Sequence, residues 1–199
     1  MNVVMVDSGG ANIGSVVYAL ERLGVKARLS ADPELIQAAE RVILPGVGAA
    51  AEGMRRLGEH GLVELIPRLR QPVLGICLGM QLMFQGSAEG ATDCLGVFQG
   101  RAGLLPDDPD HRVPHMGWNG LRFPRSCPLF QGVEQGSHVY FVHSYALPVT
   151  DDIVAVADHG IEFGAAAWRD NFYATQFHPE RSAWVGERIL KNFLELPCS

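Results

Sequence analysis

Short apolar runs rich in β-branched residues alternate with segments of helical periodicity over residues 1–85, and this alternation constrains the fold more than any other feature. Short apolar runs bounded by turn residues are typical of buried strands, whereas apolar positions three and four residues apart indicate amphipathic helices. Strands that alternate with helices form parallel α/β sheets. We therefore predict strands at residues 2–7, 26–30, 41–44 and 72–76, and helices at residues 11–23 and 78–85.

The pattern changes after Val97, where short apolar runs are separated by Gly and Pro. We predict further strands, some of them antiparallel, at residues 139–146, 153–157, 165–169 and 172–177. An amphipathic helix is expected at residues 182–196. Its apolar positions are Val185, Ile189, Phe193 and Leu196. Residues 103–114, rich in Pro and Asp, are expected to form a loop and not a domain boundary.

Size and composition indicate one globular domain over residues 1–199. The chain has a mass of 21.6 kDa, with 47% hydrophobic and 19% charged residues. A chain of this length can bury a sizeable core without disulfides or a structural metal. It contains no internal repeat, low-complexity tract or interdomain linker. We expect an α/β domain with a mixed, mostly parallel central sheet flanked by helices.

Charge and targeting signals favour a cytoplasmic protein with a small-molecule ligand or a protein partner. The net charge of -6 and the scattered Lys and Arg residues offer no basic patch for nucleic acid or an anionic membrane. The first residues lack a basic signal-peptide region, and no apolar run is long enough to span a membrane. None of the four cysteines forms a C-x-x-C pair, so we interpret them as thiols. Three are expected to be ordinary buried or surface thiols: Cys94, Cys127 and Cys198.

Cys77 lies in the segment GICLG at residues 75–79, between a predicted strand and a predicted helix. This segment has the form of a nucleophile elbow with Cys in place of Ser, and its two glycines make the sharp turn possible. A thiol at a helix N-terminus is favoured as the thiolate, which is the attacking species. The backbone N–H of Leu78 would point to where an oxyanion develops. The alternative is a structural cysteine buried at a tight turn.

A base for this thiol could come from the segment QFHPE at residues 176–180. It follows the last predicted strand, and parallel α/β sheets carry their active sites at the carboxyl ends of strands. His178 could take and return a proton near neutral pH, and Glu180 could fix its tautomer. Taken alone, the His-x-Glu triplet is a weak signal and is more typical of a solvated loop.

Together, the segments GICLGMQ (75–81) and QFHPE (176–180) resemble the class I, triad-type glutamine amidotransferases. Three further segments resemble one branch of the family, the glutaminase subunits of imidazole glycerol phosphate synthase in histidine biosynthesis. They are LPGVG (44–48), PHMGWN (114–119) and FVHSY (141–145). Relatives that serve anthranilate, GMP, CTP or carbamoyl phosphate synthesis generally lack the PHMGWN block. The resemblance covers nearly the whole chain and implies a flavodoxin-like fold.

The resemblance implies roles for particular residues. Cys77 would attack the carboxamide of glutamine, His178 would protonate the departing ammonia, and Glu180 would orient His178. The oxyanion hole would involve Gly46, Val47, Gly48 and Leu78, and bound glutamine would be held by Gln81, Ser144 and Tyr145. Without the resemblance, residues 45–48 would be interpreted as an ordinary turn, Gln81 as a polar residue on a helix, and Ser144 and Tyr145 as the end of a half-buried strand.

The resemblance also implies a partner, because the chain offers no second catalytic domain to use the ammonia. In the family this partner is a (β/α)8-barrel cyclase subunit, and the heterodimer makes imidazole glycerol phosphate, AICAR and glutamate. Family interface positions correspond to Asn12, Trp118, Tyr140 and Arg181. Large aromatic residues are more often found in a core, which is the alternative for Trp118 and Tyr140.

Other functions remain open from the sequence. They are the amidotransferase subunit of a different synthase, a catalytically dead binding module, and a free-standing thiol peptidase or γ-glutamyl hydrolase. A zinc deaminase is excluded because the Pro-Cys-x-x-Cys partner of its His-x-Glu motif is missing. Residues 8–14 match neither a dinucleotide fingerprint nor a Walker loop. We expect no cofactor and no metal, since six histidines share no ligand spacing: His60, His111, His115, His138, His143 and His159.

Overall fold

The protein is described by a computed structural model for residues 1–8 and 13–197. Its centre is a seven-stranded sheet in the order β11-β12-β13-β4-β3-β1-β2. The five strands from β13 to β2 run parallel, and β12 and β11 extend the sheet antiparallel. The strand bounds are β1 (Val3–Val6), β2 (Ala27–Ser30), β3 (Arg41–Leu44), β4 (Val73–Ile76), β11 (Ile153–Asp158), β12 (Glu162–Arg169) and β13 (Phe172–Thr175). The predicted α/β class with a mixed, mostly parallel sheet is confirmed.

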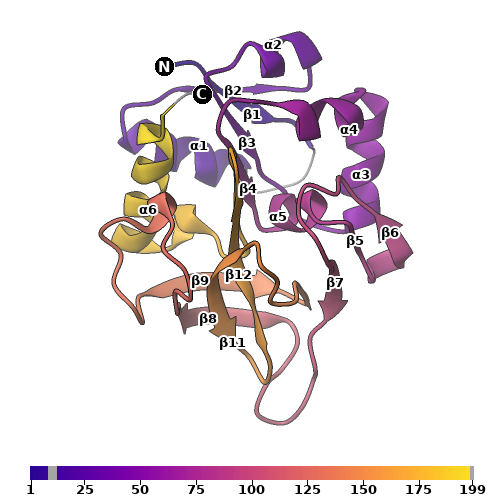
Figure 1. Cartoon of the computed structure of the whole chain (residues 1–199), viewed down its shortest axis with the longest axis vertical. Helices are drawn as coiled ribbons and strands as arrows, with labels where there is room; N and C mark the ends of the chain where they lie inside the picture. Colours follow the sequence, from indigo (N-terminus) through magenta and orange to yellow (C-terminus); the bar gives the residue numbers. More distant parts are fainter. Residues whose placement is uncertain (9–12, 198–199) are drawn as a thin grey trace.

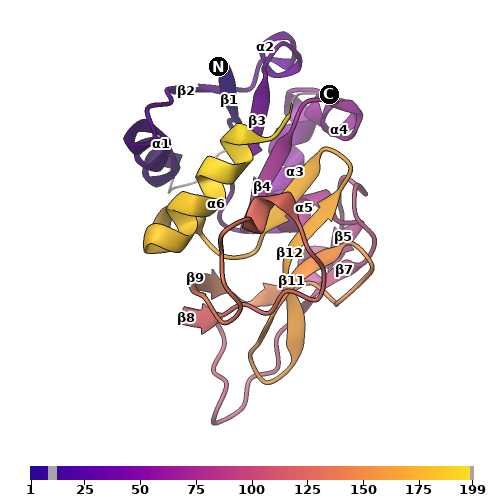
Figure 2. The ribbon, with the colours of Figure 1, turned by 60° about the vertical axis from the view of Figure 1, so that its left-hand side comes forward.

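Helices cover both faces of this sheet (Figures 1 and 2). One face carries α1 (Ile13–Arg22) and α6 (Ala183–Glu195), and the other carries α2 (Pro33–Gln37), α3 (Ala50–Glu59), α4 (Leu62–Leu65) and α5 (Leu78–Met83). Alternate residues of β1 enter the two cores: Val3 and Met5 pack with α1 and α6, and Val4 and Val6 with α2 to α5. Strands covered on both faces read as continuous apolar runs, which explains why the central strands could be predicted.

Two smaller sheets lie beyond the carboxyl ends of the central strands (Figure 1). One has the order β10-β7-β5-β6, and the other is an antiparallel ribbon of β8 and β9. Their bounds are β5 (Gly86–Ser87), β6 (Thr92–Asp93), β7 (Arg101–Leu104), β8 (His115–Gly120), β9 (His138–His143) and β10 (Tyr145–Ala146). Short 3-10 turns complete the fold: η1 (Ile66–Arg68), η2 (Glu89–Ala91), η3 (Pro128–Phe130) and η4 (Pro179–Arg181).

The strand predicted at residues 139–146 is divided between β9 and β10, which belong to different sheets. The break falls at Ser144, beside the pocket described below. The loop predicted at residues 103–114 begins after Leu104, the last residue of β7. Among the helices of residues 1–8 and 13–197, none combines the length and the apolar character needed to cross a bilayer.

Candidate active site

Cys77 occupies a sharp turn between β4 and α5, with φ +54° and ψ −109°. Positive φ is strained for a residue with a side chain, and such strain persists only where the surroundings enforce it. Two glycines let helix α5 approach strands β3 and β4 closely enough to form this turn. A Cβ added to Gly79 would lie 1.8 Å from the Leu44 carbonyl oxygen, and one added to Gly75 would lie 2.9 Å from the backbone of Gly79. The turn therefore presents the thiol at the carboxyl end of the sheet.

His178 and Glu180 follow β13, which pairs in parallel with β4. Thr175 and Ile76 are partners at the ends of the two strands, so His178 lies beside Cys77 in space although the two are far apart in sequence. His178 Nδ1 is 2.8 Å from Glu180 Oε1, and both side chains are buried, 2% and 0% exposed. This contact fixes Nδ1 as the protonated nitrogen and leaves Nε2 for proton transfer.

The pKa of His178 is raised to about 10. Burial alone would lower this pKa, but hydrogen bonding and electrostatic attraction to Cys77 and Glu180 outweigh it. The imidazolium is therefore favoured beside the thiol of Cys77. A protonated histidine can stabilise a thiolate and then donate its proton to a leaving group.

A pocket of about 440 Å³ opens over these residues. Its walls include most of the predicted site: Val47, Gly48, Cys77, Leu78, Gln81, Ser144, Tyr145 and His178. Of the predicted oxyanion and glutamine-binding positions, only Gly46 does not line it. The structure thus gathers residues from four distant segments around one thiol.

The sequence led us to expect a backbone N–H of Leu78 that is free to face an oxyanion, but in the structure this N–H is already bonded. It donates a hydrogen bond to the carbonyl oxygen of Gly46, with an N to O distance of 3.3 Å. The peptide after Gly46 therefore points its carbonyl, and not the Val47 N–H, towards the elbow. A turn of this peptide would release the Leu78 N–H and aim a second one at an oxyanion.

Gln81 and Gln176 form a hydrogen-bonded pair under the nucleophile. Gln81 Nε2 donates to the carbonyl oxygen of Tyr145 and to Gln176 Oε1, each at 3.0 Å. Gln176 Nε2 in turn donates to Cys77 Sγ at 3.8 Å. With both donor hydrogens of Gln81 engaged, its Oε1 is the atom left to accept a hydrogen bond from a ligand.

Comparison with known proteins identifies the family. A model of the class-I glutamine amidotransferases matches residues 4–196. The chain belongs to the class-I glutamine amidotransferase family. Among its relatives, the HisH subunit of imidazole glycerol phosphate synthase from Xylella fastidiosa (strain Temecula1) is 54% identical over 197 residues, which cover 99% of this chain and 98% of that protein. The HisH subunit from Xanthomonas campestris pv. campestris (strain 8004) is 53% identical over 195 residues, 98% of each chain.

Solved structures agree with this assignment at the level of the fold. A glutamine amidotransferase structure superposes with a TM-score of 0.75 at 18% identity and covers 98% of both chains. A second glutamine amidotransferase, from Thermotoga maritima, superposes with a TM-score of 0.63 at 16% identity, over 98% of this chain and 83% of that one. The family model and the HisH relatives confirm the resemblance seen in the two sequence motifs, and the solved structures confirm the fold.

In this amidotransferase, three of the four predicted interface residues lie together on one exposed face. Trp118 and Tyr140 are cross-strand partners in the β8–β9 ribbon, with ring centroids 6.1 Å apart. The guanidinium of Arg181 lies over the Tyr140 ring, 4.5 Å from its centroid. Trp118 is 53% exposed, so the alternative of a core residue is wrong for it. Asn12 lies outside the described residues.

Neither Glu89 nor Gln176 carried a predicted role. Glu89, in η2, lines the pocket and accepts a hydrogen bond from the backbone N–H of Ala50 at 2.9 Å. Its carboxylate places negative charge where the α-ammonium of an amino acid could bind. Gln176 is fully buried beside the thiol, although it belongs to the motif that supplied His178. In the described part of the chain, no three His, Cys, Asp or Glu side chains are grouped as a metal site would require.

Glu180→Gln is expected to lower kcat for glutamine hydrolysis on the order of 10³-fold with little change in KM, by analogy with the acidic member of other triads. A neutral amide can still hydrogen-bond to His178 Nδ1 but no longer stabilises the imidazolium. Steady-state glutaminase kinetics measure the effect. Glu187→Gln, the same change on the exposed side of α6, should behave as the wild type. Equal rates of glutamine hydrolysis by the two variants would show that Glu180 is not a member of the triad.

Proposed function

We propose that this chain is the glutaminase subunit of an imidazole glycerol phosphate synthase, which hydrolyses glutamine to glutamate and ammonia in histidine biosynthesis. The observation that carries the proposal is the pocket in which Cys77, at a strained elbow, meets the buried His178–Glu180 pair. The HisH names of relatives more than 50% identical over nearly the whole chain supply the pathway.

The reaction uses these residues in two stages. The thiolate of Cys77 attacks the carboxamide carbon of glutamine, the carbonyl electrons move to the oxygen, and backbone N–H groups stabilise the resulting oxyanion. Collapse of this intermediate breaks the C–N bond, and His178 gives its proton to the leaving nitrogen, which departs as ammonia. His178, now neutral, removes a proton from water, which attacks the glutamyl thioester. Glutamate leaves and Cys77 regains its thiolate.

Pocket residues would hold the substrate in this orientation. The Oε1 atom of Gln81 and the carboxylate of Glu89 are acceptors for the α-ammonium of glutamine. Ser144 and Tyr145 line the wall between β9 and β10, where their backbone can contact the amino-acid end of the ligand. The pocket therefore offers acceptors for an α-ammonium as well as a nucleophile for a carboxamide, which suits a free amino acid with a carboxamide side chain.

The ammonia would pass to a (β/α)8-barrel cyclase subunit, with which this chain forms a heterodimer in the cytoplasm. The exposed face of Trp118, Tyr140 and Arg181 is the proposed docking surface. It is connected to the triad, because the backbone N–H of His178 donates to the carbonyl oxygen of Tyr140 at 2.9 Å. In the family, activity stays low until the partner binds its nucleotide, and a Leu78 N–H bonded to Gly46 is consistent with such a resting state.

Glutamate release by the purified chain, alone and with the cyclase subunit plus its ribonucleotide ligand, tests the proposal. We expect weak hydrolysis alone and strong stimulation in the liganded complex. Equal hydrolysis in both conditions would support the chemistry but contradict partner control and point to another branch of the family. An absence of hydrolysis in both would indicate a catalytically dead module.

A further inference from the structure

Two buried histidines lie behind the glutamine pocket, and the reaction described above does not use them. His143 is the last residue of β9 and lines the pocket, and His115 is the first residue of β8. The two are cross-strand partners in the ribbon, and His115 Nδ1 is 2.9 Å from His143 Nε2. Buried polar side chains are retained where every donor meets an acceptor, so the direction of these hydrogen bonds can be worked out.

The tautomers of both rings follow from one carbonyl group. His143 Nδ1 is 2.9 Å from the carbonyl oxygen of Tyr145, and a carbonyl can only accept, so this nitrogen carries a proton. In a neutral His143, Nε2 is then an acceptor and receives its proton from His115 Nδ1. His115 Nε2 must also accept, and its neighbour is the amide nitrogen of Asn119 at 3.4 Å.

The same carbonyl group connects the histidines to the nucleophile. Besides His143, the oxygen of Tyr145 accepts a hydrogen bond from Gln81 Nε2. Gln81 also donates to Gln176, which donates to the thiol of Cys77. An unbroken series of hydrogen bonds therefore links His115, through the wall of the pocket, to the reacting sulfur.

The surroundings of the pair disfavour an additional proton. His159 stacks on His115 at 4.2 Å between ring centroids, and the apolar ring of Phe141 covers His115 from another side, at 4.9 Å. His178, protonated in the triad, acts on His143 from the pocket side. A second proton on His143 would point its Nε2–H at the Nδ1–H of His115. A proton on Nε2 of His115 would face Asn119 Nδ2, which is itself a donor and is held by the Asp158 carbonyl oxygen at 2.7 Å.

The pKa values of His115 and His143 are both lowered, which is consistent with this geometry. Burial first, then the positive charges that His143 and His159 can carry, lower the pKa of His115 to about 3. Burial lowers the pKa of His143 to about 4, assisted by His159 and His178 and opposed by the hydrogen bond to Tyr145. Both rings are therefore neutral throughout the pH range of the reaction.

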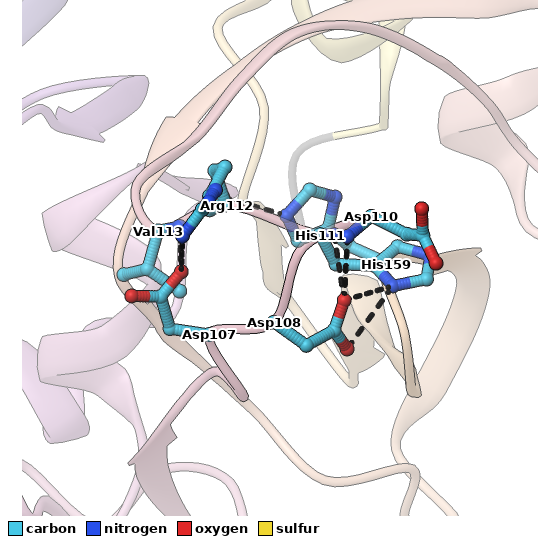
Figure 3. A network of polar contacts seen from close by, with 7 residues as sticks. All are labelled: Asp107, Asp108, Asp110, His111, Arg112, Val113 and His159. Carbon is cyan, nitrogen blue, oxygen red and sulfur yellow. Dashed lines mark hydrogen bonds and ion pairs between the residues drawn. The ribbon is translucent and has the colours of Figure 1, made fainter.

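His159, which stacks on His115, is also held by the loop after β7 (Figure 3). Asp108 accepts hydrogen bonds from the backbone N–H groups of Asp110 and His111, each at 2.9 Å, and pairs with the ring of His111. The His111 ring meets His159 edge to face, and His159 Nε2 donates to the carbonyl oxygen of Arg112 at 2.9 Å. The carboxylate that Figure 3 joins to a histidine ring is that of Asp108, and the ring is that of His111.

We propose that His143 and His115 are positioning residues of the glutamine pocket: a neutral pair that fixes the Tyr145 carbonyl and, through Gln81 and Gln176, the thiol of Cys77. This inference rests on the proposed function. The pair acts through Tyr145 and Gln81 and takes no proton from the substrate. Loss of the His143 donor removes one of the two hydrogen bonds that hold the Tyr145 carbonyl, the other being that from Gln81, and the strand end that faces bound glutamine is then less firmly oriented.

Two substitutions of His143 separate the donor from the bulk of the ring. Asn carries an amide nitrogen near the place of Nδ1 and can still donate to Tyr145, whereas Gln carries it near the place of Nε2 and cannot. In the liganded complex, His143→Gln should raise KM for glutamine about tenfold, the size expected for one lost hydrogen bond. His143→Asn should largely restore the wild-type KM. His138→Gln, the same change at an exposed position of β9, should have no effect.

Nitrogen-15 NMR of histidine-labelled wild-type protein gives a second readout that needs no variant. At neutral pH, both rings should show a protonated Nδ1 and an unprotonated Nε2. A protonated Nε2 on either ring would overturn the proposal, as would an unchanged KM in a folded His143→Gln variant or equal impairment of the Asn and Gln variants. If the wild-type complex hydrolyses no glutamine, the proposed function fails, and the tautomers still decide whether the neutral pair exists.

Discussion

Cys77→Ala is expected to abolish glutamine hydrolysis while the assembled complex keeps its activity with ammonium salts. The thiol supplies the bond-forming electrons, and within residues 1–8 and 13–197 no other sulfur lines the pocket. Removing a nucleophile of this kind lowers kcat by at least about 10⁴-fold in other triad enzymes. Alanine suits the site structurally, because it is smaller than cysteine and leaves the glycines of the elbow unchanged.

The measurement is glutamate release and, separately, product formation from ammonium by the same preparation. Cys127→Ala is the matched control, since Cys127 is also buried but lies outside the pocket. Its hydrolysis rate should equal that of the wild type. Glutamine hydrolysis by Cys77→Ala within tenfold of the wild type would contradict the assignment of the nucleophile.

Gly79→Ala is expected to have the largest effect on stability. The new Cβ would lie 1.8 Å from the carbonyl oxygen of Leu44 and 2.8 Å from its carbon, both in the backbone of β3. No side-chain rotation can relieve a clash between backbone atoms, so α5 must move away from the sheet. We expect a loss of about 3 kcal/mol in the free energy of unfolding, the upper end for overpacking. For a chain of this size, that corresponds to a melting temperature lower by roughly 10 °C.

Thermal and urea unfolding of Gly79→Ala and Gly58→Ala measure this effect. Gly58 lies in α3 with nothing within 4 Å of an added Cβ. Alanine is the better helix former, so Gly58→Ala should keep or raise the stability by up to about 1 kcal/mol. A Gly79→Ala variant as stable as Gly58→Ala would show that the helix does not need its close approach to β3.

The strands β1, β3 and β4 were predictable because each is a short, mainly apolar run between turn residues, and every residue in them is buried. The elbow was predictable for a similar reason, since two glycines around Cys77 admit a turn that other residues would block. The segment 176–180 could be paired with it because strand ends in a parallel sheet share one edge. The strands and the elbow are encoded by residues close together in the sequence, and the pairing of the two segments follows from the general geometry of a parallel sheet.

Other elements depend on distant contacts and could not be predicted in this way. The strand β8 has the sequence HMGWNG, with two glycines and little β propensity, and exists as the partner of β9. Helix α3 begins without a side-chain cap at Ala49 and contains two glycines, so its local signal is weak. The hydrogen bond from Leu78 to Gly46 depends on one peptide orientation, which no residue type specifies. The series from His115 to Cys77 joins segments that only the fold brings together.

Labelling with a chloroketone analogue of glutamine tests most directly that this pocket binds glutamine and that Cys77 attacks it. The analogue carries an electrophilic carbon near the position of the carboxamide carbon, so a bound molecule alkylates the attacking thiol irreversibly. Peptide mass spectrometry of the liganded complex should find the adduct on Cys77, with labelling prevented by excess glutamine and not by short peptides. Labelling of Cys94 or Cys127 in its place, or labelling of Cys77 that glutamine does not slow, would contradict the proposed activity.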